Sequence, residues 1–327
     1  IKFFIRSSFI FGFDSQYSID IKFLDVFEII VNNDIVPLTY IAQQLNTESK
    51  LNCFYCNKIV DRFPKLIDLI PETTTQLKKL ENSIHQLFTD PKICLPAAWA
   101  SVKVGDAANP RITKFGGVRP YLPLEGPVKC SKCHDQCCMI CQIYVPSTPQ
   151  WFQDQFPLDN RNILIAAFYC NSCFQSVETR TFTEKELDSI VYINDIVYQG
   201  SICYTFNSPR LVLEWTTGSM VPQQCNTLYR TLKRQLFGDD DSKMIIDNYF
   251  EYYNYLHGPQ CDNMTYLGGY ANFVQTDEQP DDAFLVMNLE ESTSSPAIFG
   301  DAGSAQIFMT NPVDGILGES SGTWASC

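Results

Sequence analysis

The chain has 327 residues, of which 45% are hydrophobic and 19% charged, a balance typical of a globular protein with a sizeable core. Its 24 basic and 37 acidic residues give a formal charge of −13, which argues against nucleic acid and against an anionic membrane surface as partners. A basic protein partner would suit this charge, although plain solubility is the favoured explanation.

Residues 1–92 are expected to form a mainly helical region. Ile1–Phe13 is apolar enough for a short strand or hairpin, but it is too short to span a membrane and lacks a signal-peptide cleavage site. Cys53 and Cys56 are interpreted as core thiols, with metal binding as the alternative. Apolar residues recur at helical spacing in four stretches: Asp20–Asn32, Leu38–Leu45, Ile59–Ile70 and Thr75–Phe88.

The pattern changes from Pro96 onward to short runs rich in Val, Ile, Phe and Tyr, bounded by turn-forming residues. Two later helices are also expected, at Asn226–Phe237 and Ser242–Leu256. The candidate strands are Ala98–Val104, Met139–Val145, Asn162–Tyr169, Gly200–Phe206, Leu211–Trp215, Ala283–Asn288 and Ala305–Thr310.

An internal repeat is present in this second part. A Gly-Gly pair occurs in each copy, at Gly116–Gly117 and at Gly268–Gly269. A strand with a central amide follows each pair, with Gln142 in the first copy and Asn288 in the second, and then another strand. Glycine pairs permit the positive φ of a tight turn at a strand edge. We therefore expect residues 93–327 to form a duplicated α+β domain with mostly antiparallel sheets, its repeats at about 97–215 and about 260–312.

Two segments carry a family resemblance. ITKFGGVRPYLP, together with YLGGYANFVQTDEQP and the following FLVMNL and FGDAGSAQIFMT, resembles the two signatures of the YwqG-like family, a domain of unknown function. The resemblance spans residues 97–310. It implies an α+β fold with duplicated, mostly antiparallel sheets.

The cysteine-containing segment carries a second, partial resemblance. GGVRPYLP, KCSKC, CQIYVP and FYCNSC look like the programmed cell death protein 2 family. Members of that family act as chaperones for a small-subunit ribosomal protein. The C-terminal cysteine motifs of that family are missing here, because Cys203, Cys225, Cys261 and Cys327 are all solitary.

The strongest chemical signal is a candidate metal site. Cys130 and Cys133 form one Cys-x-x-Cys pair, and Cys170 and Cys173 form a second pair 36 residues further on. Four thiolates suit a closed, tetrahedral structural zinc site. Two predicted strands separate the pairs, so the pairs would meet at one end of a hairpin. Reduced core cysteines or one disulfide are the alternatives.

Several neighbours compete for a place in this site. His134, Cys137 and Cys138 follow directly and could replace one of the four ligands. Cys141 lies in an apolar strand and is interpreted as a core residue. Because Cys-x-x-Cys pairs in a large domain indicate metal ligation or reduced thiols, we expect an intracellular, cytoplasmic protein.

No catalytic motif emerges from the sequence. The three histidines, His85, His134 and His257, lie near no known nucleophile motif, and no phosphate-binding loop, dinucleotide fingerprint or metalloprotease motif is present. The polar residues of the two signatures are expected to satisfy neighbouring main-chain groups or to cap turns: Gln142, Gln275, Asn288 and Asp301.

These observations favour a non-catalytic interaction or scaffold protein, a subunit of a larger assembly, with a structural zinc site. The alternative is a chaperone-like binder of a basic protein, for example a ribosomal protein. An enzyme acting on a small ligand is the minority hypothesis.

Overall fold

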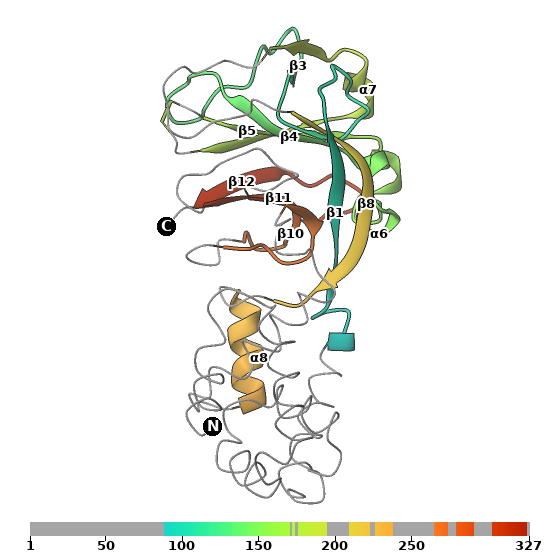
Figure 1. Cartoon of the computed structure of the whole chain (residues 1–327), viewed down its shortest axis with the longest axis vertical. Helices are drawn as coiled ribbons and strands as arrows, with labels where there is room; N and C mark the ends of the chain where they lie inside the picture. Colours follow the sequence, from blue (N-terminus) through green and yellow to red (C-terminus); the bar gives the residue numbers. More distant parts are fainter. Residues whose placement is uncertain are drawn as a thin grey trace, which may run out of the picture. The chain divides into compact units, whose positions relative to one another are not determined.

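The computed structural model describes residues 88–170, 172–173, 176–194, 209–222, 226–237, 265–273, 279–290 and 303–325 (Figure 1). Nearly all of them belong to one compact unit, formed by Asp90–Leu232 and Phe250–Cys327. The helices expected before Phe88, the strand at Gly200–Phe206 and the helix at Ser242–Leu256 lie outside the described residues. So do Cys53, Cys56, His85, His257, Gln275 and Asp301.

A ten-stranded antiparallel sheet dominates this unit, in the order β12-β11-β10-β9-β1-β8-β2-β4-β5-β6. A separate two-stranded sheet pairs β3 (Arg119–Tyr121) with β7 (Val191–Ile193). The strands of the large sheet are β1 (Leu95–Val104), β2 (Lys114–Phe115), β4 (Cys138–Tyr144), β5 (Leu164–Tyr169), β6 (Val177–Phe182), β8 (Arg210–Met220), β9 (Tyr266–Gly268), β10 (Ala283–Glu290), β11 (Ser304–Thr310) and β12 (Ser320–Ala325).

The expected α+β class is wrong for this unit. The part of the chain that the structure describes is mostly antiparallel β and contains three α-helices: α6 (Gln150–Gln153), α7 (Glu184–Leu187) and α8 (Thr227–Phe237). The expected helix at Asn226–Phe237 is confirmed as α8, but α6 and α7 are single turns in the connections between strands. None of the described helices is long and apolar enough to cross a membrane.

The two halves of the large sheet, on either side of β1 and β8, have the same succession of strand lengths. β1 and β8 form the long central pair, and each leads to a short strand and then to three longer ones (Figure 1). The short strand β2 is followed directly by Gly116–Gly117, and β9 ends at Gly268, the first glycine of the second pair. All four glycines have positive φ. A register shift interrupts the β4–β5 ladder between Met139 and Cys141, and another interrupts the β10–β11 ladder between Leu285 and Met287.

Three apolar clusters show how the sheet is layered. The central cluster joins residues of β4 and β5 to residues of β10 and β11, so the two halves of the sheet face each other across it. Alternate residues of β5 divide between faces: Ile165, Ala167 and Tyr169 join this central cluster, whereas Leu164, Ala166 and Phe168 join an outer one. Both faces of β5 are therefore buried, which explains its uninterrupted apolar sequence.

The sheet curls until its two outermost strands meet. The Thr179 hydroxyl of β6 donates a hydrogen bond to the Ser320 carbonyl of β12 at 2.9 Å, and the Thr181 and Ser320 hydroxyls lie 3.2 Å apart. Gly322 of β12 packs closely against Val177 of β6. The result is a nearly closed, barrel-like sheet whose seam is held by side chains.

Candidate metal centre

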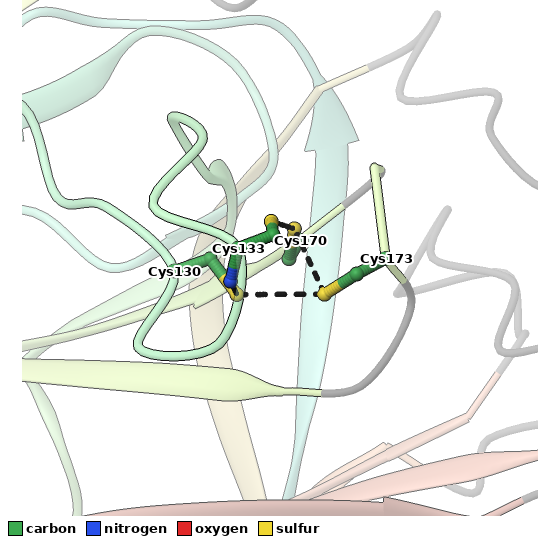
Figure 2. Close-up of side chains that lie close together, drawn as sticks. All are labelled: Cys130, Cys133, Cys170 and Cys173. Atoms are coloured by element: carbon green, nitrogen blue, oxygen red, sulfur yellow. Dashed lines mark hydrogen bonds between the residues drawn. The ribbon is translucent and has the colours of Figure 1, made fainter.

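Two turns at one end of the β4–β5 pair bring four thiols together. Cys130 and Cys133 lie in the segment between β3 and β4, whereas Cys170 and Cys173 lie between β5 and β6. Because Cys138 at the start of β4 pairs with Tyr169 at the end of β5, the two turns meet at the same end of the sheet. Figure 2 shows the four side chains pointing toward one another. This is the meeting point that the spacing of the two pairs predicts.

The four sulfur atoms have the spacing that a metal ion requires. All lie within 4.8 Å of one another. Cys130 and Cys173 are 3.5 Å apart, and Cys133 and Cys170 are 3.4 Å apart. A disulfide would need about 2.05 Å, whereas tetrahedral zinc with Zn–S bonds of about 2.3 Å places its sulfurs about 3.8 Å apart. The cluster is compatible with a metal site and unlike a pair of disulfides.

Hydrogen bonds stabilise the negatively charged thiolate form of Cys130. The backbone N–H groups of Lys132 and Cys133 point at its sulfur, at 3.3 and 3.5 Å, and the Ser176 hydroxyl lies 3.1 Å away. Burial opposes ionisation of this thiol, but these hydrogen bonds outweigh it and lower its pKa to about 6. A metal needs thiolate ligands, so this environment favours binding.

Glu178 of β6 connects the turn of Cys130 and Cys133 to β6, the strand that follows Cys170 and Cys173. Its carboxylate accepts a hydrogen bond from the Ser131 backbone N–H at 2.7 Å. Although burial opposes ionisation, hydrogen bonds from Ser131 and Ser176 lower the pKa of Glu178 below its ordinary value. Glu178 therefore ties the loop of the first cysteine pair to the strand that follows the second.

The competing ligands lie outside this cluster. His134 is exposed and has a positive φ of 65°. Cys137 is buried, and burial, with added charge from Cys170 and Cys130, raises the pKa of its thiol far above the ordinary value. Cys138 is buried on β4. Cys141 is a fully buried core residue, as predicted, and burial raises the pKa of its thiol.

The signature amides have the structural role predicted for them. Gln142 donates from its side-chain nitrogen to the carbonyls of Asn109 and Ile112, both at 2.9 Å. The side-chain oxygen of Asn288 accepts from the Asn272 backbone N–H at 3.1 Å. Both amides thus satisfy main-chain groups of the segments that cross the sheet.

One buried ion pair was not anticipated by the sequence analysis. Lys114 on β2 is fully buried, and its ammonium group lies 2.5 Å from the Asp106 carboxylate. It also donates to the Val118 carbonyl at 2.8 Å and stands over the Tyr192 ring. The sequence offers one signal for it, a lysine within the apolar run that leads into the first Gly-Gly pair.

The described residues thus define an antiparallel β protein with a four-thiol cluster suited to a metal ion. The model of the family "Domain of unknown function (DUF1963)" matches residues 113–312, which is more than half of the chain. The chain therefore belongs to this family, and the expected domain of unknown function is confirmed. No curated protein matches the chain. The YwqG-like name and the likeness to programmed cell death protein 2 stay predictions.

Proposed function

We propose that the four thiols bind one structural zinc ion and that the protein is a non-catalytic interaction or scaffold protein. The observation that carries this proposal is the closed arrangement of Cys130, Cys133, Cys170 and Cys173, since four sulfur ligands leave zinc no open position for a substrate or a reactive water. Zinc also suits these ligands better than magnesium or calcium, which prefer oxygen.

The proposed ion would hold the two cysteine turns against the outer apolar cluster. Cys130 and Cys170 belong to the outer cluster, together with Met139 of β4 and with Phe168 of β5. Joining the two turns through a metal keeps these side chains away from water. In this proposal the ion stabilises the surface of a scaffold, which serves as a subunit of a larger intracellular assembly.

Metal content and thermal stability test the zinc proposal. We expect about one zinc per chain in the purified protein and its loss with a strong chelator. A metal that contributes about 4 kcal/mol to the stability of the folded state would lower Tm by roughly 10 °C when it is removed. Unchanged zinc content and unchanged Tm after chelation would count against a structural ion.

Two cysteine substitutions provide a matched comparison. Cys170→Ser removes one sulfur of the cluster, whereas Cys141→Ala removes a fully buried core thiol outside it. We expect Cys170→Ser to lose zinc and Cys141→Ala to retain it. Equal zinc content in the two variants would show that the cluster is not the binding site.

The scaffold role is tested by purification from the native source at low and high salt, with mass spectrometry of the proteins that copurify. A large assembly that stays attached at both concentrations supports a built-in subunit. Capture of one basic protein that high salt releases would instead favour the chaperone-like alternative, because charge-steered contacts weaken with ionic strength.

A further inference from the structure

Arg119 of β3 is a buried cation that contacts the segment between the first cysteine pair and β4. Only 1% of its surface is exposed. Its guanidinium donates to the Cys137 carbonyl at 2.6 Å and to the side-chain oxygen of Gln136 at 2.7 Å, while its Nε is buried without a partner. Both acceptors are neutral, so neither offsets the positive charge.

Within the part of the chain that the structure describes, no carboxylate forms an ion pair with Arg119. Three other arginines, all more exposed than Arg119, do form such pairs. They are Arg111 with Asp188, Arg161 with Asp154, and Arg180 with Glu125 and Glu186. A charge taken out of water without a counter-charge costs several kcal/mol. Among the described residues, Arg119 is thus the most deeply buried of these four arginines and the one without a carboxylate partner.

The segment that Arg119 contacts runs alongside the first cysteine turn. Gln136 pairs with Lys129 in a short bridge, and the Cys130 backbone N–H donates to the Asp135 carbonyl at 2.8 Å. The Cys137 side chain belongs to the same apolar cluster as Cys130 and Cys170. Arg119 therefore holds the segment that leaves the first cysteine turn and leads into β4.

We propose that Arg119 supplies the positive charge that balances a tetrathiolate metal centre and so raises its affinity for a divalent cation. Four thiolates and one divalent ion carry a net charge of −2, which is costly to bury unless a cation lies nearby. Arg119 is a positioning and charge-balancing residue and not a ligand. This inference rests on the metal site of the proposed function.

The test is a chelator competition that measures the zinc dissociation constant of the full chain. Arg119→Met removes the charge but keeps much of the side-chain volume, and we expect the dissociation constant to rise about tenfold or more. Arg119→Lys keeps the charge, so its constant should stay within about threefold of the wild type. Arg180→Met, which removes an arginine of β6 that has carboxylate partners, is the control and should change little.

Gln136→Leu separates charge from hydrogen bonding, because it removes an acceptor of Arg119 without changing any charge. Its zinc affinity should also stay within about threefold of the wild type. If Arg119→Met does not fold, the zinc dissociation constants of Gln136→Leu and Arg119→Lys are the test. The thiolate-to-cobalt charge-transfer band of the cobalt-substituted variants should match that of the wild type, which shows that the four ligands are intact.

Distinct results overturn the two proposals. Zinc affinity equal to the wild type in Arg119→Met, or a tenfold loss in Gln136→Leu or Arg119→Lys, would overturn the charge-balancing role. A lower Tm with an unchanged dissociation constant would show that Arg119 only packs. A wild-type chain that takes up no zinc would instead overturn the metal site itself.

Discussion

Gly117 has no room for a side chain in the first Gly-Gly pair. Its φ is +86°, and a Cβ at this position would lie 2.4 Å from the Asp106 carboxylate. That carboxylate accepts from the Val118 backbone N–H and pairs with buried Lys114. We expect Gly117→Ala to lower the free energy of unfolding by about 3 kcal/mol, because it adds backbone strain and displaces the carboxylate that pairs with the buried Lys114. Chemical denaturation measures this loss.

Gly126 is the matched control for this prediction. It has a positive φ of +74°, but no atom lies within 4 Å of the position that its Cβ would take. Gly126→Ala should therefore cost only the backbone term, about 1 kcal/mol. Equal losses in the two variants would mean that the contact with Asp106 is unimportant.

Glu290 on β10 gives the protein a pH-dependent contribution to stability. Burial raises the pKa of its carboxyl, although hydrogen bonds from Asn272 and Asn288 act against this shift. A raised folded-state pKa favours the folded state fully below the unfolded pKa, and the contribution is lost as the pH rises through the folded pKa. Glu290→Gln should therefore become more stable relative to the wild type as the pH rises above about 4.

Denaturation of both proteins across this pH range measures the difference. Gln keeps the acceptor oxygen for the two asparagines, so a change in packing should be small. A stability difference that does not vary with pH would argue that Glu290 titrates normally.

The clustering of the four cysteines could be predicted because Cys-x-x-Cys spacing is local and thiol chemistry is specific. Arg119 and Lys114 could not, because charged residues are expected at the surface and only tertiary contacts show otherwise. Arg119 is 1% exposed and Lys114 fully buried. Their neighbours in space, Gln136 and Asp106, carry no motif that would mark them.

At the scale of elements, strands with apolar sequences could be predicted. β4, β5, β10 and β11 were expected close to their observed bounds, since they are continuous apolar runs. β2 and β9 were missed because strands of two or three residues contain no periodicity. β6 and β12 were missed because they lie at the edges of the sheet and have polar sequences, VETRTF and SSGTWA.

The single turn of α7 depends on its capping box. Glu186 accepts hydrogen bonds from the Thr183 backbone N–H and hydroxyl, both at 2.7 Å. Leu187, at the end of α7, is buried in the outer cluster with Cys130 and Cys170. Glu186→Ala should cost about 1 kcal/mol of unfolding free energy.

Lys185→Ala provides the comparison for the cap, since Lys185 is exposed on the same turn. We expect it to change the unfolding free energy by less than about 0.5 kcal/mol. If both variants unfold at the same denaturant concentration, the cap does not stabilise this turn.

At the scale of the whole molecule, the expected α+β class was wrong, because the described residues are mostly antiparallel β. The α+β expectation came from the internal repeat, from the family resemblance and from two expected helices, of which Ser242–Leu256 lies outside the described residues. Among the described residues, pairing between strands far apart in the sequence determines the architecture. Such pairing has no local signature, which is why neither the seam nor the curled sheet could be foreseen.

The seam between β6 and β12 predicts a coupling between two residues. A Cβ on Gly322 would lie 2.4 Å from a methyl carbon of Val177. We expect Gly322→Ala and Val177→Ala each to destabilise the protein, and the double variant to lose at least about 1 kcal/mol less than the sum. Equilibrium unfolding of the three variants gives this coupling energy.

Gly315→Ala combined with Val177→Ala is the control, because nothing lies within 4 Å of the position of a Gly315 Cβ. Its two effects should add to within about 0.5 kcal/mol. Additive effects for Gly322 and Val177 as well would mean that the two edges of the sheet do not touch in solution.

The central position of β1 has a consequence for how the chain folds. Its ladder partners, β8 and β9, both come later in the sequence, and even its nearest pairing joins Val104 to Arg210. β4 and β5, in contrast, each pair with the next strand along the chain as it emerges from the ribosome. Long-range pairings of this kind form slowly. During synthesis, more than a hundred residues are added after β1 before β8 and then β9 can pair with its two edges.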